Sequence, residues 1–393
     1  MKKTIRDYNL FQKKVLIRCD FNVPIKDGKI IDDTRIKESL QTIRYAALNK
    51  AKVILFSHLG KVKEEKDLVK NDLLKVSERL SELLEQKIIF VPHTRGEKLE
   101  KAINELNPGD ILLVQNTRYE DLTDKKESKN DQELAKYWSS LGDIFINDAF
   151  GTIHRNHASN VGIATYLPSG IGFLVEKELK ELSVLNNPIH PYVVILGGAK
   201  VNDKVGTILS LSKKADYILV GGGMALTFLA SKNINVGSSL VDSDSLEFSK
   251  EILEKYKDKI ILPLDLVVSS SIESSESKIC LVGEMSKEEK AFDIGPKTVN
   301  LFKKYLMNAK TVMWNGPLGV YEKDLYKAGT FDILNMLTTL DCTVILGGGD
   351  IVAASAKANV KDKITHASTG GGATLEYLEG KSLPGLEVIS ERE

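Results

Sequence analysis

Polar and cationic side chains stand directly after four apolar runs in the first half of the chain. In an open α/β sheet, ligands bind beyond the carboxyl ends of the strands, so residues at these positions bear on function. Guanidinium groups pair with carboxylates and phosphates through two parallel hydrogen bonds, and several of them at one sheet edge would form an anion pocket. The residues at these positions are Asp20, Phe21, Asn22 and Arg35, then His58, Leu59, Gly60 and Lys61, then Asn116 and Arg118, and last Asp148, His154 and Arg155.

Glycine-rich turns follow several apolar runs in the second half of the chain. Glycine lets the backbone approach a ligand closely with free N–H groups, and a helix that starts there adds the positive end of its dipole. Lys200 and Lys204 are four residues apart, a spacing that would place both on one helix face. These features predict a surface that binds phosphate groups or a nucleotide. The turns are 197–200, 221–224, 347–350 and 368–373.

Asp350 stands after a glycine turn and before a predicted helix. A single carboxylate at this place suits Mg²⁺ that is otherwise bound by phosphate oxygens and water, and the position is compatible with an N-cap. The motif GxxxxGK[ST] does not occur, and GxGxxG fails at Leu226 and Val352, which argues against a P-loop kinase and a nicotinamide dehydrogenase. A cationic half beside a nucleotide-binding half with a metal carboxylate indicates phosphoryl transfer.

The apolar runs that carry these residues alternate with amphipathic stretches. The runs are almost continuously apolar, as in parallel strands buried on both faces. The alternation predicts an α/β fold, and ten strands are better divided between two sheets of five or six. We therefore expect two doubly wound, Rossmann-like domains. The predicted strands are 15–18, 53–57, 88–91, 111–115 and 144–147, and then 192–196, 217–220, 260–263, 311–314 and 343–346.

The domain boundary is expected near Pro168–Pro191. Gly172–Leu185 has a helical pattern, and the two prolines after it would end that helix. Residues 1–170 are predicted to form the first domain, 171–187 a hinge helix and 188–373 the second domain. Further helices are expected within Asp72–Gln86 and, with Asp131 as N-cap, within Asp131–Leu141. The charged segments Lys61–Lys70 and Glu120–Glu133 are predicted to be solvated surface.

Composition narrows the class of protein further. The chain has 393 residues, 42% of them hydrophobic, and its 54 basic and 54 acidic residues balance. That balance argues against a nucleic-acid or membrane binder that works by bulk charge. Three scattered cysteines, the lack of a secretory signal in MKKTIRDYNL and the lack of a long apolar stretch predict a soluble cytoplasmic protein with reduced thiols. His154 and His157 have no acidic or cysteine partner at ligand spacing, which argues against zinc.

Longer motifs resemble those of the phosphoglycerate kinase family, in order and over essentially the whole chain. They are DFNVP (20–24), DDTRI (32–36), SHLG (57–60), DAFGTIHRNHAS (148–159), LGGAKVNDK (196–204), GGGMALTFL (221–229), DIGPKT (293–298), TVMWNGPLGVYE (311–322), GGGD (347–350) and STGGGATLEYLEGKSLPG (368–385). The resemblance implies an ATP:3-phosphoglycerate phosphotransferase of glycolysis. It also implies two lobes joined by a hinge helix, with residues 374–393 returning to the N-terminal lobe.

The resemblance also implies roles for individual residues. The N-terminal lobe would hold 3-phosphoglycerate or 1,3-bisphosphoglycerate through Asp20, Phe21, Asn22, Arg35, His58, Leu59, Gly60, Lys61, Arg118 and Arg155. The C-terminal lobe would hold ATP or ADP through Gly198, Lys200, Lys204, Gly222, Gly223, Gly295, Asn315, Glu322, Gly348, Gly349, Asp350 and Ile351, with Asp350 on Mg²⁺. Arg35, Lys200, Gly371 and Gly372 would neutralise charge on the transferring group. The protein is expected to be a monomer.

Three residues depart from the family pattern. Lys61 stands where the family often has arginine, so the charge remains but the bidentate fork does not. Gln115 replaces the common glutamate. Ile351 stands where a threonine or serine usually contributes a hydroxyl to the nucleotide phosphates, and losing one neutral hydrogen bond, worth about 0.5–1.5 kcal/mol, predicts weaker nucleotide binding.

The implied reaction needs no proton transfer by a protein residue. A carboxylate acceptor is already ionised at pH 7 and needs no general base, so catalysis consists of in-line positioning and charge neutralisation. Because the two sites are on separate lobes, the chain would have to close to bring them together and exclude water. The rival classes are a nicotinamide dehydrogenase, which lacks the glycine fingerprint, and a non-catalytic nucleotide-binding protein, which would not need the residues of the cationic half.

Overall fold

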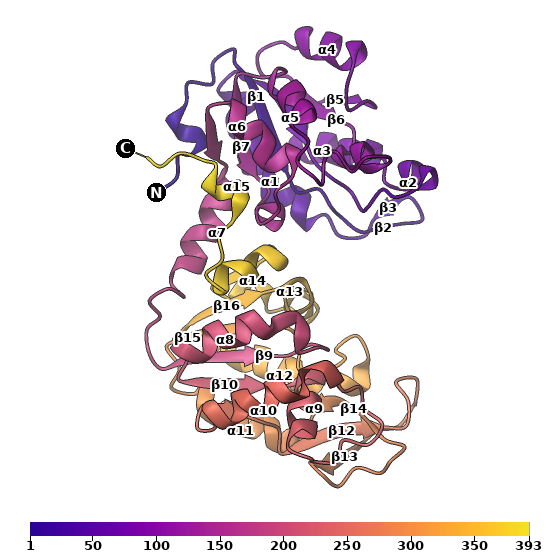
Figure 1. The fold of residues 1–393 in the computed structure, drawn as a ribbon, viewed down its shortest axis with the longest axis vertical. Coiled ribbons are helices and arrows are strands. Elements are labelled where there is room, and N and C mark those ends of the chain that lie inside the picture. The colour runs from indigo at the N-terminus through magenta and orange to yellow at the C-terminus, as the bar shows by residue number, and fades with distance from the viewer. Residues whose placement is uncertain (393) are drawn as a thin grey trace. The chain divides into compact units, whose positions relative to one another are not determined.

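The computed structural model describes residues 1–392 and divides them into two units. The first holds Met1–Lys180 together with the segment that begins at Ser382, and the second holds Glu181–Lys381. Each unit has one six-stranded sheet in which every strand pair is parallel (Figure 1). The predicted fold class, two parallel α/β domains, is confirmed.

The sheet of the first unit has β1 near its middle, with β4 on one side and β7 on the other. Five of its strands coincide with predicted strands to within one or two residues at each end, and β8, the sixth, was missed. The order across the sheet is β5 (Ile88–Val91), β6 (Ile111–Val114), β4 (Lys52–Phe56), β1 (Lys14–Cys19), β7 (Ile144–Asp148) and β8 (Ser169–Ile171).

Alternate side chains of these strands enter two separate cores. Ile17 and Leu55 pack in the core below α1 and α3, whereas Leu16 and Ile54 pack in the core below α4, α5 and α6. Burial on both faces explains why the strands are apolar without a break. The helices of this unit are α1 (Thr34–Leu48), α2 (Glu65–Lys70), α3 (Leu74–Leu84), α4 (Glu97–Asn104), α5 (Gln132–Ser139) and α6 (Ile163–Tyr166), with the hairpin β2 (Ile25–Lys26) and β3 (Lys29–Ile30) before α1.

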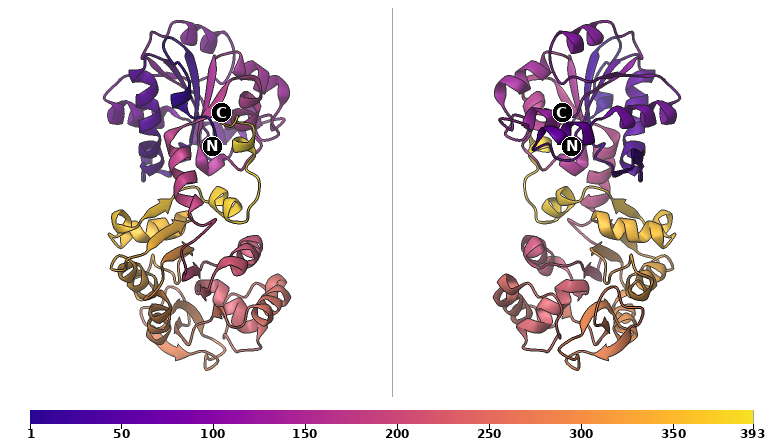
Figure 2. Two further views of the ribbon diagram at one scale, coloured as in Figure 1. Left: turned by 90° about the vertical axis from the view of Figure 1, so that its left-hand side faces the viewer. Right: turned by 90° about the vertical axis from the view of Figure 1, so that its right-hand side faces the viewer.

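The second unit repeats the plan with helices on both faces of its sheet (Figures 1 and 2). Across the sheet the strands are β11 (Ile260–Ile261), β10 (Tyr217–Val220), β9 (Tyr192–Leu196), β15 (Thr311–Asn315), β16 (Thr343–Gly347) and β17 (His366–Ser368). The helices are α8 (Val205–Lys214), α9 (Gly222–Ser231), α10 (Leu246–Lys255), α11 (Pro296–Leu306), α12 (Ala328–Leu337), α13 (Gly349–Lys357) and α14 (Gly372–Leu378).

A small antiparallel sheet adds to the second unit and was not predicted. Its order is β13 (Lys278–Leu281), β12 (Asp265–Ser269) and β14 (Lys290–Ile294). Its inward residues Leu266 and Val268 pack against Leu226 and Leu229 of α9 in a core of their own. The strand β13 is mostly exposed and β14 is buried only at its end, unlike the continuous apolar runs of the main sheet, so the sequence pattern does not indicate this sheet.

The first unit gives way to the second within α7 (Phe173–Ser183), which lies inside the predicted connecting helix. Residues up to Lys381 belong to the second unit because the end of α14 is tied to α8, where Ser210 Oγ donates to the Leu378 carbonyl at 2.8 Å. The chain then rejoins the first unit through α15 (Pro384–Glu387), whose Gly385 N–H donates to the Ile153 carbonyl at 2.9 Å. Of the segment 374–393 that was predicted to return, residues 374–381 stay with the second unit, and Glu393 lies outside the described residues.

One surface prediction holds and another is wrong. Lys61–Lys70 is mostly exposed, and α2 within it buries no residue. In Glu120–Glu133, however, Glu120, Asp121 and Glu127 are buried. Each of these carboxylates has cationic or hydroxyl partners inside the first unit, which the sequence pattern did not reveal.

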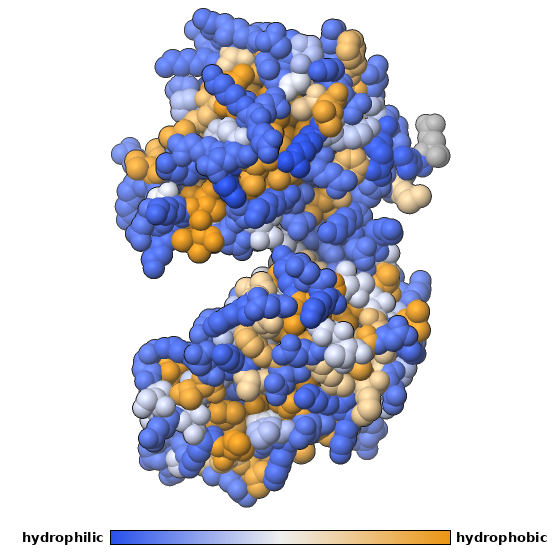
Figure 3. All heavy atoms as spheres, turned by 180° about the vertical axis from the view of Figure 1, so that it is seen from behind, coloured by the Kyte–Doolittle hydropathy of each residue, from blue (hydrophilic) through white to orange (hydrophobic). Residues whose placement is uncertain are grey.

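The surface of each unit is predominantly hydrophilic on the face that Figure 3 shows, with apolar patches between the charged side chains. Exposed apolar side chains of this kind are normal for folded domains. Among residues 1–392, no helix is both long and apolar enough to cross a bilayer.

Candidate active site

The predicted anion-binding residues of the first unit gather at the carboxyl edge of its sheet. Asp20 follows β1, His58 follows the neighbouring β4, and Arg118 follows β6 on the far side of β4. Arg155 follows β7, the other neighbour of β1. Because all these strands are parallel, their ends deliver the four side chains to one edge.

Side-chain hydrogen bonds hold the loops of this edge together. Arg35 Nη1, from the first turn of α1, donates to Asp20 Oδ2 at 2.9 Å. Gly60 N–H donates to Asn22 Oδ1 at 2.9 Å, and Phe21 N–H donates to Ser57 Oγ at 2.8 Å. The β1 and β4 loops are therefore linked by one side-chain contact in each direction.

His58 lies buried among the arginines. Burial is the largest cause that holds its pKa well below the ordinary value, followed by the charges of Arg18, Arg118, Arg155 and Arg35. The imidazole is therefore neutral at pH 7. The contact of His58 Nδ1 with Arg18 Nη2 at 3.4 Å and the common edge of the strand ends place the ring in this cationic surrounding.

The neighbouring histidines experience the same positive field. Burial and, after it, the charges of Arg118, Arg18 and Arg155 lower the pKa of His157 to about 3. Burial and Arg155 lower the pKa of His154 to about 4. A site that excludes positive charge from three histidines is one that favours an anion.

Asn116 and Arg118 position the loop after β6. The Asn116 amide donates to the Leu59 carbonyl at 2.7 Å and accepts from Leu59 N–H at 3.2 Å, so it clamps the loop of His58. Arg118 Nη1 donates to Asp121 Oδ2 at 2.7 Å and also contacts Ser128 Oγ. Arg118 is thus held by an acidic residue of the segment that was expected to be surface.

Lys61 stands apart from this buried group. Its side chain is exposed, whereas its carbonyl accepts a hydrogen bond from Asn71 Nδ2 at 2.9 Å. Asn22, Leu59 and Gly60 also line a pocket of about 770 Å³ beside the β2–β3 hairpin. The predicted residues of the first unit therefore include a half-buried group of arginines around buried His58 and an exposed lysine.

Arg18 is a member of the cluster that was not predicted as a site residue. It belongs to β1, has no exposed surface and contacts His58 Nδ1 through Nη2 at 3.4 Å. The signal was available, because an arginine within the otherwise apolar run VLIRC must find partners when both faces of the strand are buried.

The glycine turns of the second unit meet through their backbones. Gly198 N–H donates to the Pro317 carbonyl at 2.9 Å, and Met224 N–H donates to the Gly198 carbonyl at 3.0 Å. A Cβ on Gly222 would lie 2.8 Å from the Gly198 nitrogen, and one on Gly223 would lie 2.8 Å from the Ala199 oxygen. These glycines are needed for close packing of the turns, whatever else they contact.

Lys204 and Lys200 differ in their surroundings. Lys204 Nζ donates to the Gly197 carbonyl at 2.5 Å, and burial lowers its pKa to about 8 although the charges of Asp350 and Asp203 oppose the shift. Lys200 is exposed and precedes α8, which begins only at Val205. The two lysines therefore do not share a helix face, contrary to the inference from their spacing.

A pocket of about 690 Å³ opens at this edge of the second unit. Its polar lining includes Gly198, Gly222, Gly223, Glu322 and Asp350, all predicted nucleotide-binding residues. Its remaining wall is largely apolar. A concave site with one apolar wall and a few polar groups suits a ligand with a flat base and a charged tail. The apolar side chains of the wall include Leu226, Leu240, Val241, Ile272, Pro317 and Leu318.

Asn315, Gly348 and Gly349 lie at the ends of β15 and β16. Asn315 is buried, its amide donates to the Gly347 carbonyl, and its Oδ1 has no partner among residues 1–392. Gly348 has φ +120° at the N-cap of α13, a conformation that a side chain would strain. Gly349 is exposed with open space at its Cβ position.

Two predicted nucleotide-binding residues have mainly structural surroundings. The Ile351 side chain has no exposed surface and packs in the core of the main sheet. A Cβ on Gly295 would lie 2.3 Å from the Asp265 carboxyl carbon, and Gly295 N–H donates to the Asp265 carbonyl at 2.9 Å. Neither residue lines the pocket of the second unit.

Gly371 and Gly372 lie at the start of α14. Gly371 has φ +55° as the residue before the helix, and no atom crowds its Cβ position. Ser368 and Thr374 brace this turn through a hydroxyl–hydroxyl hydrogen bond of 2.7 Å. The turn therefore presents backbone rather than side chains.

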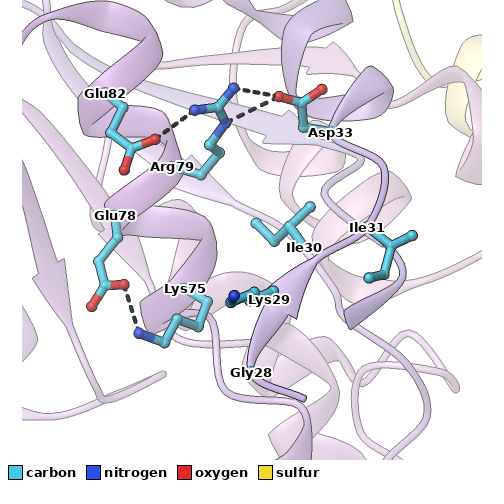
Figure 4. A pocket seen from close by; sticks show the side chains of 9 residues that line it. All are labelled: Gly28, Lys29, Ile30, Ile31, Asp33, Lys75, Glu78, Arg79 and Glu82. Carbon is cyan, nitrogen blue, oxygen red and sulfur yellow. Dashed lines mark hydrogen bonds and ion pairs between the residues drawn. The ribbon is translucent and has the colours of Figure 1, made fainter. Parts of the chain in front are cut away.

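A further pocket, of about 390 Å³, lies between the β2–β3 hairpin and α3 in the first unit (Figure 4). Most of its charged groups are paired with one another. Arg79 donates to Asp33 Oδ2 at 2.7 Å and to Glu82 Oε2 at 2.5 Å, and Lys75 donates to Glu78 Oε2 at 2.8 Å. The arginines that converge with His58 are at the carboxyl edge of the sheet instead.

Neither unit groups many side chains that could ligate a metal ion. Among the described residues, no three histidine, cysteine or acidic side chains are grouped so that they could hold an ion by themselves. Asp350 lines the pocket of the second unit as an exposed carboxylate. One carboxylate fits Mg²⁺ that takes its other ligands from nucleotide phosphates and water.

A cationic cluster at the sheet edge of one α/β unit and a glycine-lined pocket on another are typical of a phosphotransferase. The family model described as phosphoglycerate kinase matches residues 5–381. Curated phosphoglycerate kinases from Macrococcus caseolyticus and Fusobacterium nucleatum are 53% and 54% identical to this chain, over 100% of both chains in each pair. The chain belongs to the phosphoglycerate kinase family.

Solved structures extend the comparison to the fold. The phosphoglycerate kinase from Coxiella burnetii is 36% identical and has a TM-score of 0.86, covering 99% of this chain and 98% of that one. The enzyme from Pyrococcus horikoshii is 31% identical and has a TM-score of 0.87, covering 98% of each chain.

Proposed function

We propose that this kinase transfers a phosphoryl group reversibly between ATP and 3-phosphoglycerate, forming ADP and 1,3-bisphosphoglycerate in glycolysis. Family membership over the whole chain supports the reaction. The observation that carries the site is the delivery of His58, Arg35, Arg118 and Arg155 to one carboxyl edge of a parallel sheet. A pocket with that charge suits a small molecule that bears both a carboxylate and a phosphate.

The first unit binds the phosphoglycerate. Arg35, Arg118 and Arg155 pair with its anionic groups, and neutral His58 donates a hydrogen bond without adding charge. Asp20 orients Arg35 through their 2.9 Å hydrogen bond. The remaining proposed contacts are Phe21, Asn22, Leu59, Gly60 and Lys61.

The second unit binds the nucleotide. Lys200 and Lys204 pair with the phosphates, and Asn315 and Glu322 contact phosphate and ribose. The apolar wall of the 690 Å³ pocket packs on the base. The glycines proposed to leave room or donate N–H groups are Gly198, Gly222, Gly223, Gly348 and Gly349. Gly295 and Ile351 are proposed to contribute through their backbone alone, because neither side-chain position lines the pocket.

Asp350 is proposed to hold Mg²⁺. When bound, the ion would supply neutralisation of the phosphate charge. Asp350 would be its one protein carboxylate, and the other ligands would come from phosphate oxygens and water.

Catalysis by this chain consists of positioning and charge neutralisation. The substrate carboxylate is ionised at pH 7, so no residue needs to remove a proton. Arg35, Lys200 and the N–H groups of Gly371 and Gly372 stabilise the charge on the transferring phosphoryl group. The two ligands must be brought into line with water excluded, and α7 and its flanking turns are the proposed hinge.

The proposed setting is a cytoplasmic monomer that needs neither nucleic acid nor membrane. Zero net charge and the absence of a membrane-spanning helix among the described residues support this setting. Size-exclusion chromatography with light scattering, repeated with MgADP and 3-phosphoglycerate, tests the monomer directly.

Acyl-phosphate formation from MgATP and 3-phosphoglycerate, trapped with hydroxylamine, tests the reaction. Replacing Arg35 with alanine should lower turnover by about 100-fold or more, because one preorganised charge contact at a transition state is worth that much. MgADP affinity, measured by calorimetry, should stay unchanged in Arg35→Ala. Equal losses of turnover and nucleotide affinity would contradict the separation of the two sites.

A further inference from the structure

Glu127 is a buried carboxylate that the proposed reaction does not use. It lies in the loop between β6 and α5 and has no exposed surface. Its Oε2 accepts the Ser159 N–H at 2.9 Å, and its Oε1 accepts the Ser159 hydroxyl. A buried charge is costly unless it has a partner, so the location of its counter-charge decides what Glu127 does.

Ser159 connects Glu127 to Arg18. Arg18 Nε donates to Ser159 Oγ at 2.8 Å, and the Ser159 hydroxyl donates in turn to Glu127. A serine hydroxyl has a single hydrogen. Because that hydrogen is directed at the carboxylate, the lone pairs of the Ser159 oxygen accept from the guanidinium. The series of hydrogen bonds therefore has one direction, from Arg18 through Ser159 to Glu127.

Arg18 connects this pair to His58. Its Nη2 lies 3.4 Å from His58 Nδ1, whereas the nearest carboxylate oxygen of Asp20 is 4.0 Å from the same nitrogen. A guanidinium can only donate, so His58 Nδ1 must be the acceptor. In a neutral imidazole the proton is then on Nε2, which is left to donate elsewhere.

We propose that Glu127 is a positioning residue that acts through Ser159 and Arg18 to hold His58 in the Nε2–H tautomer. In this form the ring offers a hydrogen-bond donor to an anion without adding a charge to the pocket. Insofar as the anion is 3-phosphoglycerate, the inference rests on the proposed function.

The charges explain why Glu127 is needed for this geometry. Glu127 and Asp20 are the carboxylates whose charges favour protonated Arg18. Without the charge of Glu127, Asp20 is the remaining counter-ion, so we expect Arg18 to shift towards it. Asp20 already binds Arg35, and an Arg18 guanidinium attracted only from the Asp20 side would change its 3.4 Å Nη2–Nδ1 contact with His58. His58 would then lose the contact that selects its tautomer.

Two-bond ¹H–¹⁵N spectra of the full chain measure the tautomer directly. In the native chain His58, assigned by the loss of its signals in His58→Asn, should show a protonated Nε2 and an unprotonated Nδ1. Glu127→Gln should give a mixture of tautomers or a reversed preference. An unchanged Nε2–H signal in Glu127→Gln would overturn the proposal.

Steady-state kinetics give a second readout. The KM for 3-phosphoglycerate should rise about tenfold in Glu127→Gln, since a hydrogen bond to a charged group of the substrate is stronger than a neutral one. The KM for ATP should not change. Glu120→Gln is the matched control, because Glu120 is a buried carboxylate of the same segment that binds Thr94 and Arg95 instead.

Ser159→Ala keeps the proposal testable if Glu127→Gln does not fold. Ser159→Ala removes the middle member of the same series of hydrogen bonds, so it should disturb the His58 tautomer in the same way. The two substitutions together should have no larger effect than either alone. Fully additive effects would contradict a single chain. Failure of the proposed reaction would appear differently, as absent product with the native His58 tautomer intact.

Discussion

Gly172 lies directly against the carboxyl group of Asp148. A Cβ at position 172 would be 2.3 Å from Asp148 Oδ1, so no other residue fits there without displacement. The same oxygen accepts the N–H of Leu174 at 2.9 Å in the first turn of α7. The end of β7 thus fixes the start of the helix that leads out of the first unit.

Stability should fall as pH rises from about 4 to 7 through Asp148. Burial raises the pKa of this carboxyl to about 7 from an ordinary value of 3.8, so the folded chain retains a proton that the unfolded chain has lost. The contribution is complete below pH 4 and absent above pH 7. Urea unfolding of the native chain and of Asp148→Asn should give a difference in unfolding free energy that varies with pH over this window. A constant difference would contradict the raised pKa.

Nucleotide binding should take up protons above pH 8 through Lys204. Its pKa of about 8 means that the ammonium is partly neutral in the free protein at pH 8–9, whereas phosphates favour the charged form. Calorimetry of MgADP binding in buffers with different ionisation enthalpies measures the uptake. Lys204→Met should abolish it, and equal uptake in both proteins would assign the proton to another group.

Replacing Gln115 with glutamate should destabilise the protein while Asp72 is present. Gln115 Nε2 donates to Asp72 Oδ2 at 2.6 Å, and its Oε1 accepts from Leu73 N–H at 3.1 Å. Gln115→Glu puts two carboxylates together in a buried place and should cost about 1–3 kcal/mol. Adding Asp72→Asn restores a donor and should recover most of the loss. Chemical denaturation of the two single variants and the double variant tests this coupling, and no recovery would contradict it.

Ile351→Thr should lower stability rather than improve nucleotide affinity. The side chain is fully buried among apolar neighbours, so a hydroxyl there costs about 1–3 kcal/mol if it finds no partner. Thermal unfolding measures the loss, and titration with MgADP measures the affinity. A clear gain in affinity would instead support the expectation, drawn from sequence alone, that the missing hydroxyl weakens binding.

The main sheets were predictable because burial on both faces leaves a strong sequence pattern. Tyr192–Leu196 and Tyr217–Val220 match β9 and β10 to the residue, and Asp131 caps α5 as expected through a 2.9 Å bond to Leu134 N–H. The edge strands β8 and β17 have only three residues each, too few for periodicity to register. The antiparallel sheet was missed because its outer strands, β13 and β14, are not continuously buried and so lack an unbroken apolar run.

The candidate site was predictable in part. Polar residues at strand ends located Asp20, His58 and Arg118, because parallel strands place their ends at one edge. The buried groups behind them escaped notice, since Glu127 sits in a sequence that is charged and irregular throughout. Only the three-dimensional contact with Ser159 distinguishes it from surface residues nearby.

The return of the chain to the first unit has a consequence for biosynthesis. Lys2 Nζ donates to the Ile389 carbonyl at 2.6 Å, and Arg392 Nε donates to Asp7 Oδ1 at 2.8 Å. Residues 382–392 leave the ribosome only after the entire second unit. The unit that is synthesised first is therefore completed last. Until residues 382–392 have been synthesised, the surface of the first unit that α15 covers stays exposed to solvent, whereas the second unit already has all its residues and can fold.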